Sequence, residues 1–275
     1  MTRYDGQSAA RGSAPRGSNL AAVVLAAGAG TRLRPLTDHR PKALCSVNNV
    51  ALVDHAIAHA SAVTTEVAVN VHHGREQLEP HLAGRVHVSI EEPVALGTAG
   101  AIGALRGWLD GRDALVLNAD AWRTGDLRDL LADWDGDRIR LLVVDDPGRG
   151  DFGRWRFAGA SLLPWSVART LEPEPAALDV VCWRAADSAG RLDLAPTSET
   201  FIDCGTPADY LRANMAASGG ETVVAPDAVV NGEAIRSVIW PGARVARGER
   251  LVDAIRIGAD LTVTPLAVGT EDDRG

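Results

Sequence analysis

Two apolar patterns alternate along the first half of this chain and restrict the folds that it can adopt. Strand-like apolar runs occur at residues 20–25, 66–71, 85–90, 113–118 and 139–144. Between them, apolar residues recur at helical spacing at residues 52–60, 99–109 and 126–134. Such alternation predicts an α/β fold with a mostly parallel, doubly wound sheet and helices on both faces. Sheets of this kind bind ligands beyond the carboxyl ends of their strands.

From about residue 219 the pattern changes to apolar residues six positions apart, with Pro- and Gly-containing corners between them. Val224 and Val230 are six apart, and after a slip in register the spacing resumes at Ile239, Val245, Leu251 and Ile257. This period predicts a short, left-handed β-helix-like extension over residues 219–265. Two or three coils are too few to be stable alone, so we expect the extension to pack on the main domain or to join copies of the chain in a homo-oligomer. The alternative is an irregular β tail.

Composition sets limits on the class of protein. Residues 1–19 are rich in Gly, Ser and Arg and are expected to be a disordered tail, as are residues 266–275. We expect no membrane span, because no apolar run is long enough. The net charge of −8 argues against a nucleic-acid partner. Three irregularly spaced cysteines (Cys45, Cys182 and Cys204) form no evident disulfide or zinc framework, which favours a cytoplasmic protein with structural thiols.

A glycine-rich segment with a local excess of positive charge directly follows the first predicted strand. Leu25, Ala26, Ala27, Gly28 and Gly30 are small or strand-ending residues, so backbone N–H groups there can approach an anion. The next dozen residues are cationic in an otherwise acidic chain, and they contain Arg32, Arg34, Arg40 and Lys42. This pattern predicts a pocket for a small polyanion.

Lys42 stands out because it is the only lysine among 28 lysines and arginines. An ammonium is a compact point charge that can reach a single phosphate oxygen, whereas a guanidinium forks across two oxygens. Taken alone, one surviving lysine is equally well explained by chance. The neighbouring phosphate-binding pattern favours the functional interpretation.

Two common phosphate motifs are excluded by spacing. A dinucleotide fingerprint would need a glycine where Leu33 stands, and a Walker loop would need Gly-Lys-Ser/Thr, whereas Pro41 and Ala43 flank Lys42. The run instead resembles the signature of the sugar-1-phosphate nucleotidylyltransferases, Gly-x-Gly-Thr-Arg-Leu-x-Pro-Leu-Thr followed by Pro-Lys-x-Leu. The matching residues are Gly28, Gly30, Thr31, Arg32, Leu33, Pro35, Leu36, Thr37, Pro41, Lys42 and Leu44.

The resemblance implies a reaction and a place for each motif. Family members join an NTP to a sugar 1-phosphate and release pyrophosphate, with Mg²⁺ as cofactor, so residues 20–218 would be the nucleotidyltransferase domain. Arg32 and Lys42 would be catalytic, and Asp120 and Asp203 would hold the metal. The nucleotide would contact Leu25, Ala26, Ala27, Gly28, Gly30, Thr31, Gly97, Thr98 and Gly100, and the sugar phosphate would contact Asn118 and Gly159.

Some of these motifs are weak without the resemblance. By itself, Asp120 is more often a turn or cap residue at a strand end, and the run at Gly97 is an ordinary glycine-rich turn. With the resemblance, the Asn118-Ala119-Asp120 and Asp203-Cys-Gly-Thr-Pro segments match the family's metal-binding contexts. The small residues from Gly97 onward match its base-recognition loop, where free N–H groups at a helix start would bind the base.

The match is weakest at the acceptor. Many family members have a Glu-Lys-Pro element that contacts sugar and phosphate, and here the corresponding region, residues 145–153, has no lysine. Asp151 and Arg154 are candidates to replace it. The Leu-Gly-Thr-Ala-Gly-Ala run at residues 96–101 resembles that of mannose-1-phosphate guanylyltransferases. The Asn-Ala-Asp-x-Trp run at residues 118–122 instead resembles that of N-acetylmuramate-1-phosphate uridylyltransferases. The alternatives are a non-catalytic regulatory subunit that binds nucleotide-sugar, and a cytidylyltransferase that acts on a non-sugar phosphate such as phosphocholine.

Overall fold

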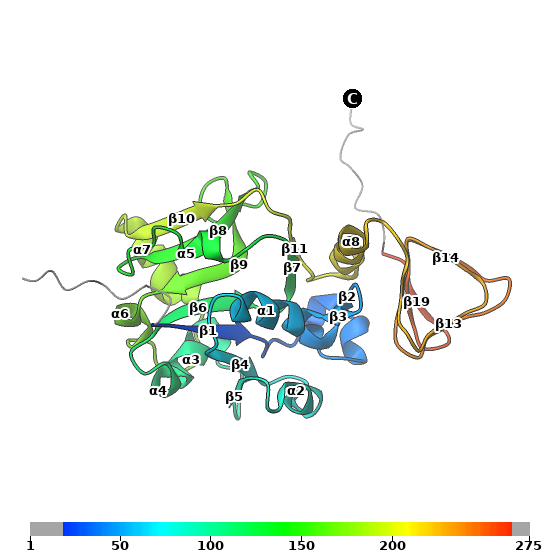
Figure 1. Cartoon of the computed structure of the whole chain (residues 1–275), viewed down its shortest axis with the longest axis horizontal. Helices are drawn as coiled ribbons and strands as arrows, with labels where there is room; N and C mark the ends of the chain where they lie inside the picture. Colours follow the sequence, from blue (N-terminus) through cyan, green and yellow to red (C-terminus); the bar gives the residue numbers. More distant parts are fainter. Residues whose placement is uncertain (1–18, 266–275) are drawn as a thin grey trace, which may run out of the picture.

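The computed structural model describes residues 19–265, so the predicted tails, apart from residue 19, lie outside the described residues. Seven strands form the central sheet in the order β10-β8-β9-β6-β1-β4-β5 (Figure 1). Their bounds are β1 Leu20–Leu25, β4 Val67–Val71, β5 His87–Ile90, β6 Asp113–Asn118, β8 Ile139–Asp145, β9 Trp155–Leu163 and β10 Leu192–Pro196. Neighbouring strands are parallel except for β9, which is antiparallel to both β6 and β8. The predicted mostly parallel α/β sheet is therefore confirmed.

Helices cover both faces of this sheet. Their bounds are α1 Leu52–Ser61, α2 Arg75–Leu82, α3 Gly97–Ala104, α4 Arg106–Leu109, α5 Arg128–Leu131, α6 Trp165–Ala168, the π-helical turn η4 Asp179–Trp183, α7 Arg184–Ser188 and α8 Pro207–Ser218. Alternate residues of β1 face opposite ways, as strand geometry requires. Ala22 and Val24 pack in the cluster that contains α1 and α2, whereas Ala21 and Val23 pack in the cluster that contains α3 and α7.

Two of the predicted helices are shorter than expected. The segment 99–109 is divided at Leu105, whose backbone (φ −86°, ψ 1°) leaves the helical region and separates α3 from α4. The segment 126–134 contains only α5, because Asp126 forms a local turn by accepting the Arg128 N–H and Asp133 takes a left-handed φ of 55°. Local side-chain bonds and positive φ values compete with helix propagation.

Two strand pairs position the site at the carboxyl edge of the sheet. β7 (Ala121–Arg123) pairs antiparallel with β11 (Phe201–Asp203), and β2 (Ser46–Val47) pairs antiparallel with β3 (Val50–Ala51). Before β2, three short 3-10 turns carry the cationic segment. These turns are η1 Thr31–Leu33, η2 Leu36–Asp38 and η3 Lys42–Leu44.

The C-terminal extension contains the short strands that its spacing predicts. They are β12 Val223–Val224, β13 Val229–Val230, β14 Glu233–Ile235, β15 Val238–Ile239, β16 Arg244–Val245, β17 Arg250–Val252, β18 Ile255–Ile257 and β19 Leu261–Val263. Strands of successive turns of the chain pair in parallel, in the sets β12-β15-β18, β13-β16 and β14-β17, and β19 returns antiparallel to β18. The extension has a triangular outline at one end of the molecule (Figure 1). The left-handed β-helix itself stays a prediction.

The six-residue spacing identifies the interior of the extension only in part. Ile239, Val245 and Leu251 are buried, but Val224 and Val230 are exposed. Val223 is buried in place of Val224. The register of the first turn therefore differs by one residue from the spacing read in the sequence, and a shift of one residue exchanges the inner and outer faces of a strand.

The extension packs on the main domain through α8. One continuous apolar cluster includes Leu33 and Leu36 of the cationic segment, Tyr210 of α8 and Trp240 of the extension. The Tyr210 hydroxyl donates to the Ser46 carbonyl (2.6 Å) and accepts the Trp240 Nε1–H (3.1 Å). This contact meets the expectation that so short an extension needs support, whereas assembly into a homo-oligomer stays a prediction. No helix among residues 19–265 has the length and apolar character of a membrane span.

Candidate functional site

A cavity of about 310 Å³ lies where β1 and β6 end, at the carboxyl edge of the sheet. Most of the residues predicted to contact the nucleotide, metal or phosphate line it together. These are Leu25, Ala26, Ala27, Gly28, Gly30, Thr31, Arg32, Lys42, Gly97, Thr98, Asn118 and Asp120. The cavity brings together segments that are far apart in the sequence, and the roles of its residues stay predictions.

The glycine-rich loop folds around the side chain of Lys42. Gly30 has a left-handed φ of 62°, and a Cβ atom there would lie 2.9 Å from the Lys42 Cβ. Only glycine fits this combination of backbone and close approach. The Thr37 hydroxyl donates to the Gly30 carbonyl (3.0 Å) and closes the turn. The signature residues therefore form a loop that holds the lysine beneath it.

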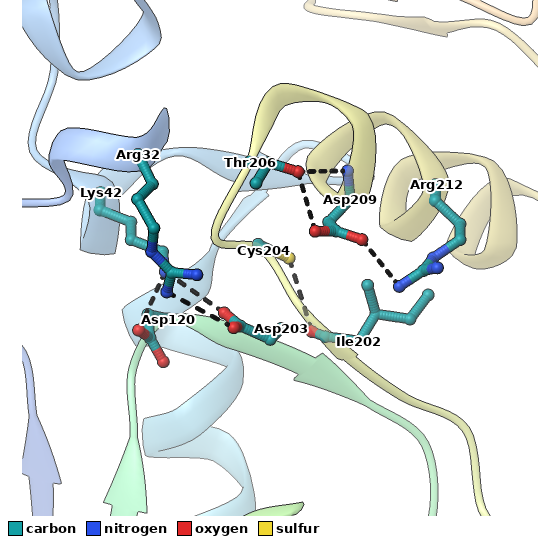
Figure 2. Close-up of polar contacts among 9 residues, drawn as sticks. All are labelled: Arg32, Lys42, Asp120, Ile202, Asp203, Cys204, Thr206, Asp209 and Arg212. Carbon is teal, nitrogen blue, oxygen red and sulfur yellow. Dashed lines mark hydrogen bonds and ion pairs between the residues drawn. The ribbon is translucent and has the colours of Figure 1, made fainter. Parts of the chain in front are cut away.

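Lys42 is 8% exposed and contacts both predicted metal ligands (Figure 2). Its Nζ atom lies 2.9 Å from Asp120 Oδ2 and 3.5 Å from Asp203 Oδ1. Arg32 approaches from the open side, where its Nη2 atom lies 3.7 Å from Asp203 Oδ2. Arg32 is 70% exposed, so its ion pair contributes little to stability. Two cations and two carboxylates thus meet at one side of the cavity.

The two carboxylates are brought together by the pairing of β7 with β11. Asp203 lies opposite Ala121 in the ribbon, and the Cys204 N–H donates to the Asp120 carbonyl (3.0 Å). Thr206 caps α8 just beyond, where its hydroxyl accepts the Asp209 N–H and donates to the Asp209 carboxylate (Figure 2). Because Cys204 is fully buried, its pKa is raised far above the usual value, which is consistent with a packing role.

The donor set suits a hard divalent cation. Asp120 and Asp203 both lie within ion-pair distance of one ammonium, so their oxygens converge on a common region beside the cavity. Carboxylate oxygens are the ligands that Mg²⁺ prefers, and it commonly takes one or two of them from a protein and the rest from phosphates and water. Residues 19–265 contain no cluster of three or more His, Cys, Asp or Glu that could hold a metal. The two carboxylates are of the kind that could hold such an ion, and that role stays a prediction.

The predicted base-recognition helix differs from the expectation in two ways. Gly100 does not line the cavity; it packs beneath it, where a Cβ atom would lie 2.2 Å from the Glu174 carbonyl oxygen. The Ala99 N–H at the helix start is not free, because it donates to the Ala176 carbonyl (3.0 Å). The small residues of α3 therefore allow close packing against the 172–176 segment, and only Gly97 and Thr98 face the cavity.

Two buried polar residues that the sequence analysis did not identify join the two sides of the cavity. Asn70 (2% exposed) accepts the Ala26 N–H through Oδ1 (2.7 Å) and donates through Nδ2 to Glu91 Oε1 (2.7 Å). Glu91 (1% exposed) accepts the Leu96 N–H through Oε2 (2.7 Å). This Asn70–Glu91 pair ties the glycine-rich loop to the loop before α3. A lone Asn in the apolar run of β4 was the available signal.

A second cavity of about 740 Å³ adjoins the first and shares Leu25, Thr98 and Asn118 with it. Asp151, one candidate to replace the missing Glu-Lys-Pro element, lines this second cavity. Arg154, the other candidate, pairs with Asp145 and lines neither of the two cavities.

Gly159 also lies outside the lining of both cavities. It is buried on β9 with a φ of 72°, and a Cβ atom there would lie 3.1 Å from the Phe201 ring. Gly159 packs against Asn118, which lines both cavities. A sugar phosphate would therefore have to reach past Asn118 to make the predicted contact with Gly159.

Comparisons with known proteins show what this fold and its first cavity resemble. A family model described as nucleotidyl transferase matches residues 21–146. N-acetylmuramate alpha-1-phosphate uridylyltransferase of Caulobacter vibrioides is 40% identical over 45% of this chain and 56% of the relative. Mannose-1-phosphate guanylyltransferase of Mycobacterium tuberculosis is 23% identical over 89% of this chain and 76% of the relative. Residues 21–146 thus match the nucleotidyl transferase family model, and the chain is similar to these two sugar-1-phosphate nucleotidylyltransferases.

Solved structures agree on the fold. A mannose-1-phosphate geranyltransferase from Thermus thermophilus superimposes with a TM-score of 0.64, at 17% identity, over 90% of this chain and 95% of that chain. HddC from Yersinia pseudotuberculosis, complexed with GMP-PN, superimposes with a TM-score of 0.57, at 19% identity, over 71% of this chain and 98% of that chain. The chain spans about half the length of the uridylyltransferase that it matches.

Proposed function

We propose that this chain transfers a nucleotidyl group from an NTP to a sugar 1-phosphate. An acceptor phosphate oxygen attacks the α-phosphorus, the bond from that phosphorus to the bridging oxygen breaks, and pyrophosphate leaves. The observation that supports this most is the contact of a buried Lys42 with Asp120 and Asp203 beside a glycine-lined cavity. The nucleophile is already an anion at neutral pH, so the reaction needs positioning and charge neutralisation and no general base.

Each side of the cavity has one task in this reaction. The N–H groups and small residues from Ala27 to Thr31 bind the β- and γ-phosphates, with Arg32 at the open side, while the Ala26 N–H stays bonded to Asn70. Lys42 neutralises charge on the α-phosphate and the incoming phosphate, and its burial makes that charge more effective than it would be in water. The nucleobase lies near Ala95, Gly97 and Thr98.

Asp120 and Asp203 hold Mg²⁺ in this proposal. When bound, the ion would neutralise and orient phosphate oxygens. The Lys42 ammonium lies beside the same two carboxylates, so the charge of the buried lysine is paired.

Pyrophosphate release tests the proposal. The full chain is incubated with Mg²⁺, each common NTP in turn, and a panel of hexose 1-phosphates, amino-sugar 1-phosphates and phosphocholine. We expect release with at least one NTP and one sugar 1-phosphate, and none when the acceptor or Mg²⁺ is omitted. Release with phosphocholine alone would favour the cytidylyltransferase alternative. Silence in every combination, with nucleotide-sugar binding retained, would favour the regulatory-subunit alternative.

The metal assignment has its own test. Asp120→Asn and Asp203→Asn each keep the size of the side chain and remove a charge, so we expect kcat to fall about 100-fold and the Mg²⁺ concentration for half-maximal activity to rise about tenfold. Asp227→Asn, an exposed residue in the extension, is the matched control. Unchanged Mg²⁺ dependence in both site variants would contradict the assignment.

A further inference from the structure

The second cavity is lined by an excess of negative charge. Its lining includes Asp151, Asp179 and Asp187 against a single cation, Arg184. The Arg184 Nη2 atom already lies 3.4 Å from Asp179 Oδ2, and Asp151 accepts the Phe157 N–H (2.8 Å). Three carboxylates and one guanidinium leave two negative charges in excess. The Asp187 carboxylate has no ion pair in the part of the chain that the structure describes.

Other cations of this region are engaged away from the cavity. Arg154 pairs with Asp145, and Arg156 pairs with Asp146 and lies over the Phe201 ring. Neither arginine is among the residues that line the second cavity. Within residues 19–265, a negatively charged ligand body would therefore meet no unpaired cation there.

The rest of the lining suits a ring with hydroxyl groups. Phe152, Phe157 and Trp183 provide aromatic surface, and the Phe157 and Trp183 rings lie 4.8 Å apart. Two lining residues that are more than nine-tenths buried, Ser161 and Trp183, have polar atoms without a hydrogen-bond partner among the described residues. Buried polar groups are normally paired, so an unpaired indole N–H and hydroxyl at one cavity point to a ligand with oxygen atoms.

The position of the second cavity relative to the first assigns it a part of the substrate. The two cavities meet at Leu25, Thr98 and Asn118, so a molecule with its phosphate near Lys42 can extend past Asn118 into the second cavity. Its larger volume, about 740 Å³ against about 310 Å³, leaves room for a sugar ring with substituents. The nucleotide, by contrast, has its binding residues in the first cavity.

We propose that the second cavity holds the body of the phosphorylated acceptor, and that its acidic lining selects a hydroxyl-rich body that is neutral or bears an amine over one that bears a carboxylate. This inference rests on the proposed function and specifies its substrate class. A carboxylate placed among unpaired acidic groups is repelled, and specificity built on such repulsion discriminates without any new attractive contact. Aromatic faces, which carry partial negative charge, act in the same direction.

Acceptors that share a ring and differ in charge test the inference. Glucose, glucosamine and glucuronic acid 1-phosphates, and the corresponding manno compounds, are compared in pyrophosphate release together with N-acetylmuramate 1-phosphate, which bears a carboxylate. We expect kcat/KM to be at least tenfold lower for each carboxylate-bearing acceptor than for its neutral partner. Equal or better use of the carboxylate-bearing compounds would overturn the inference and leave the proposed function standing. Release with no acceptor would contradict the proposed function itself.

Two variants connect the selectivity to the cavity. Asp187→Asn removes one charge at constant size, so we expect the ratio of neutral to carboxylate-bearing kcat/KM to fall about threefold, with the KM for NTP unchanged. Asp227→Asn makes the same charge change far along the chain and should leave the ratio unaltered. Trp183→Phe keeps the aromatic ring and removes the N–H, and should raise the KM for the acceptor about fivefold. If Asp187→Asn and Asp227→Asn changed the ratio of neutral to carboxylate-bearing kcat/KM equally, the acidic lining of the second cavity would have no role in the selectivity.

Discussion

The first cavity lies where β1 and β6 end, whereas the C-terminal extension is itself built from short, mostly parallel strands, and the two regions differ in the balance of polar and aliphatic groups that they bury. The cavity keeps Lys42, Asn70 and Glu91 almost fully buried, each with a partner. The interior of the extension is mostly aliphatic, with Val245 and Ile255 fully buried, although Ser237 and Arg256 are also buried there and bond to the Ile235 carbonyl and to Glu249. Burying polar groups costs free energy unless they are paired, whereas burying aliphatic groups is favourable. The comparison indicates that the cavity is organised to hold polar side chains in fixed positions. The extension, in contrast, contributes mainly apolar packing, which stabilises the main domain against which it lies.

The largest effect that this comparison predicts is on catalysis, from Lys42→Arg. The charge is kept, but a planar guanidinium does not fit the space of an 8% exposed ammonium between two carboxylates. We expect kcat/KM to fall by a factor of about 100 to 1,000, and the free energy of unfolding to fall by only about 1–3 kcal/mol from overpacking. Steady-state kinetics and urea unfolding measure the two quantities. Arg250→Lys in the extension is the control, and near-full activity of Lys42→Arg would refute the account of this site.

The extension should show the reverse pattern. Ile255→Ala removes a fully buried side chain, so we expect the free energy of unfolding to fall by about 2–4 kcal/mol, while kcat/KM at 25 °C changes less than twofold. Val252→Ala, at a residue that is 38% exposed, should cost under about 1 kcal/mol. Loss of activity in Ile255→Ala without loss of stability would remove the distinction between the two regions.

Glu91→Gln is expected to affect both quantities. The amide keeps one acceptor but places N–H groups against an N–H of Asn70 or Leu96, because both of the Glu91 oxygens accept hydrogen bonds. We expect a loss of about 1–3 kcal/mol in stability and an increase of about tenfold in the KM for NTP. Glu92→Gln changes the exposed neighbouring residue and is the matched control. A KM for NTP that stays constant would show that the Asn70–Glu91 pair does not position the loop.

Tyr210→Phe should have the smallest effect, and it tests the contact between the two regions. The substitution removes a hydroxyl that donates to the Ser46 carbonyl and accepts from Trp240. We expect a loss of about 1–2 kcal/mol in the free energy of unfolding and less than a threefold change in kcat/KM. A double-mutant cycle with Trp240→Phe measures the coupling between the two side chains. Purely additive losses would show that this hydrogen bond does not couple the extension to the main domain.

Features that depend on local pattern were predictable from the sequence. The bounds of β1 and β6 and the residues of the glycine-rich loop follow from apolar period and backbone sterics, which neighbouring residues determine. The antiparallel direction of β9, the outward side chain of Val224 and the packing of Gly100 beneath the cavity depend on tertiary contacts. The Asn70–Glu91 pair and the second cavity were missed for the same reason, because their partners lie far away along the chain.

The pairing of β7 with β11 has a consequence for how this sequence can diverge. A two-stranded ribbon sets the spacing of Asp120 and Asp203 locally, although more than eighty residues separate them along the chain. The residues between the two strands include much of the lining of the second cavity. If the proposed reaction holds, substitutions and changes of loop length in that interval would alter which acceptor is used while the two carboxylates keep their places, so the phosphate chemistry and the choice of acceptor would evolve separately.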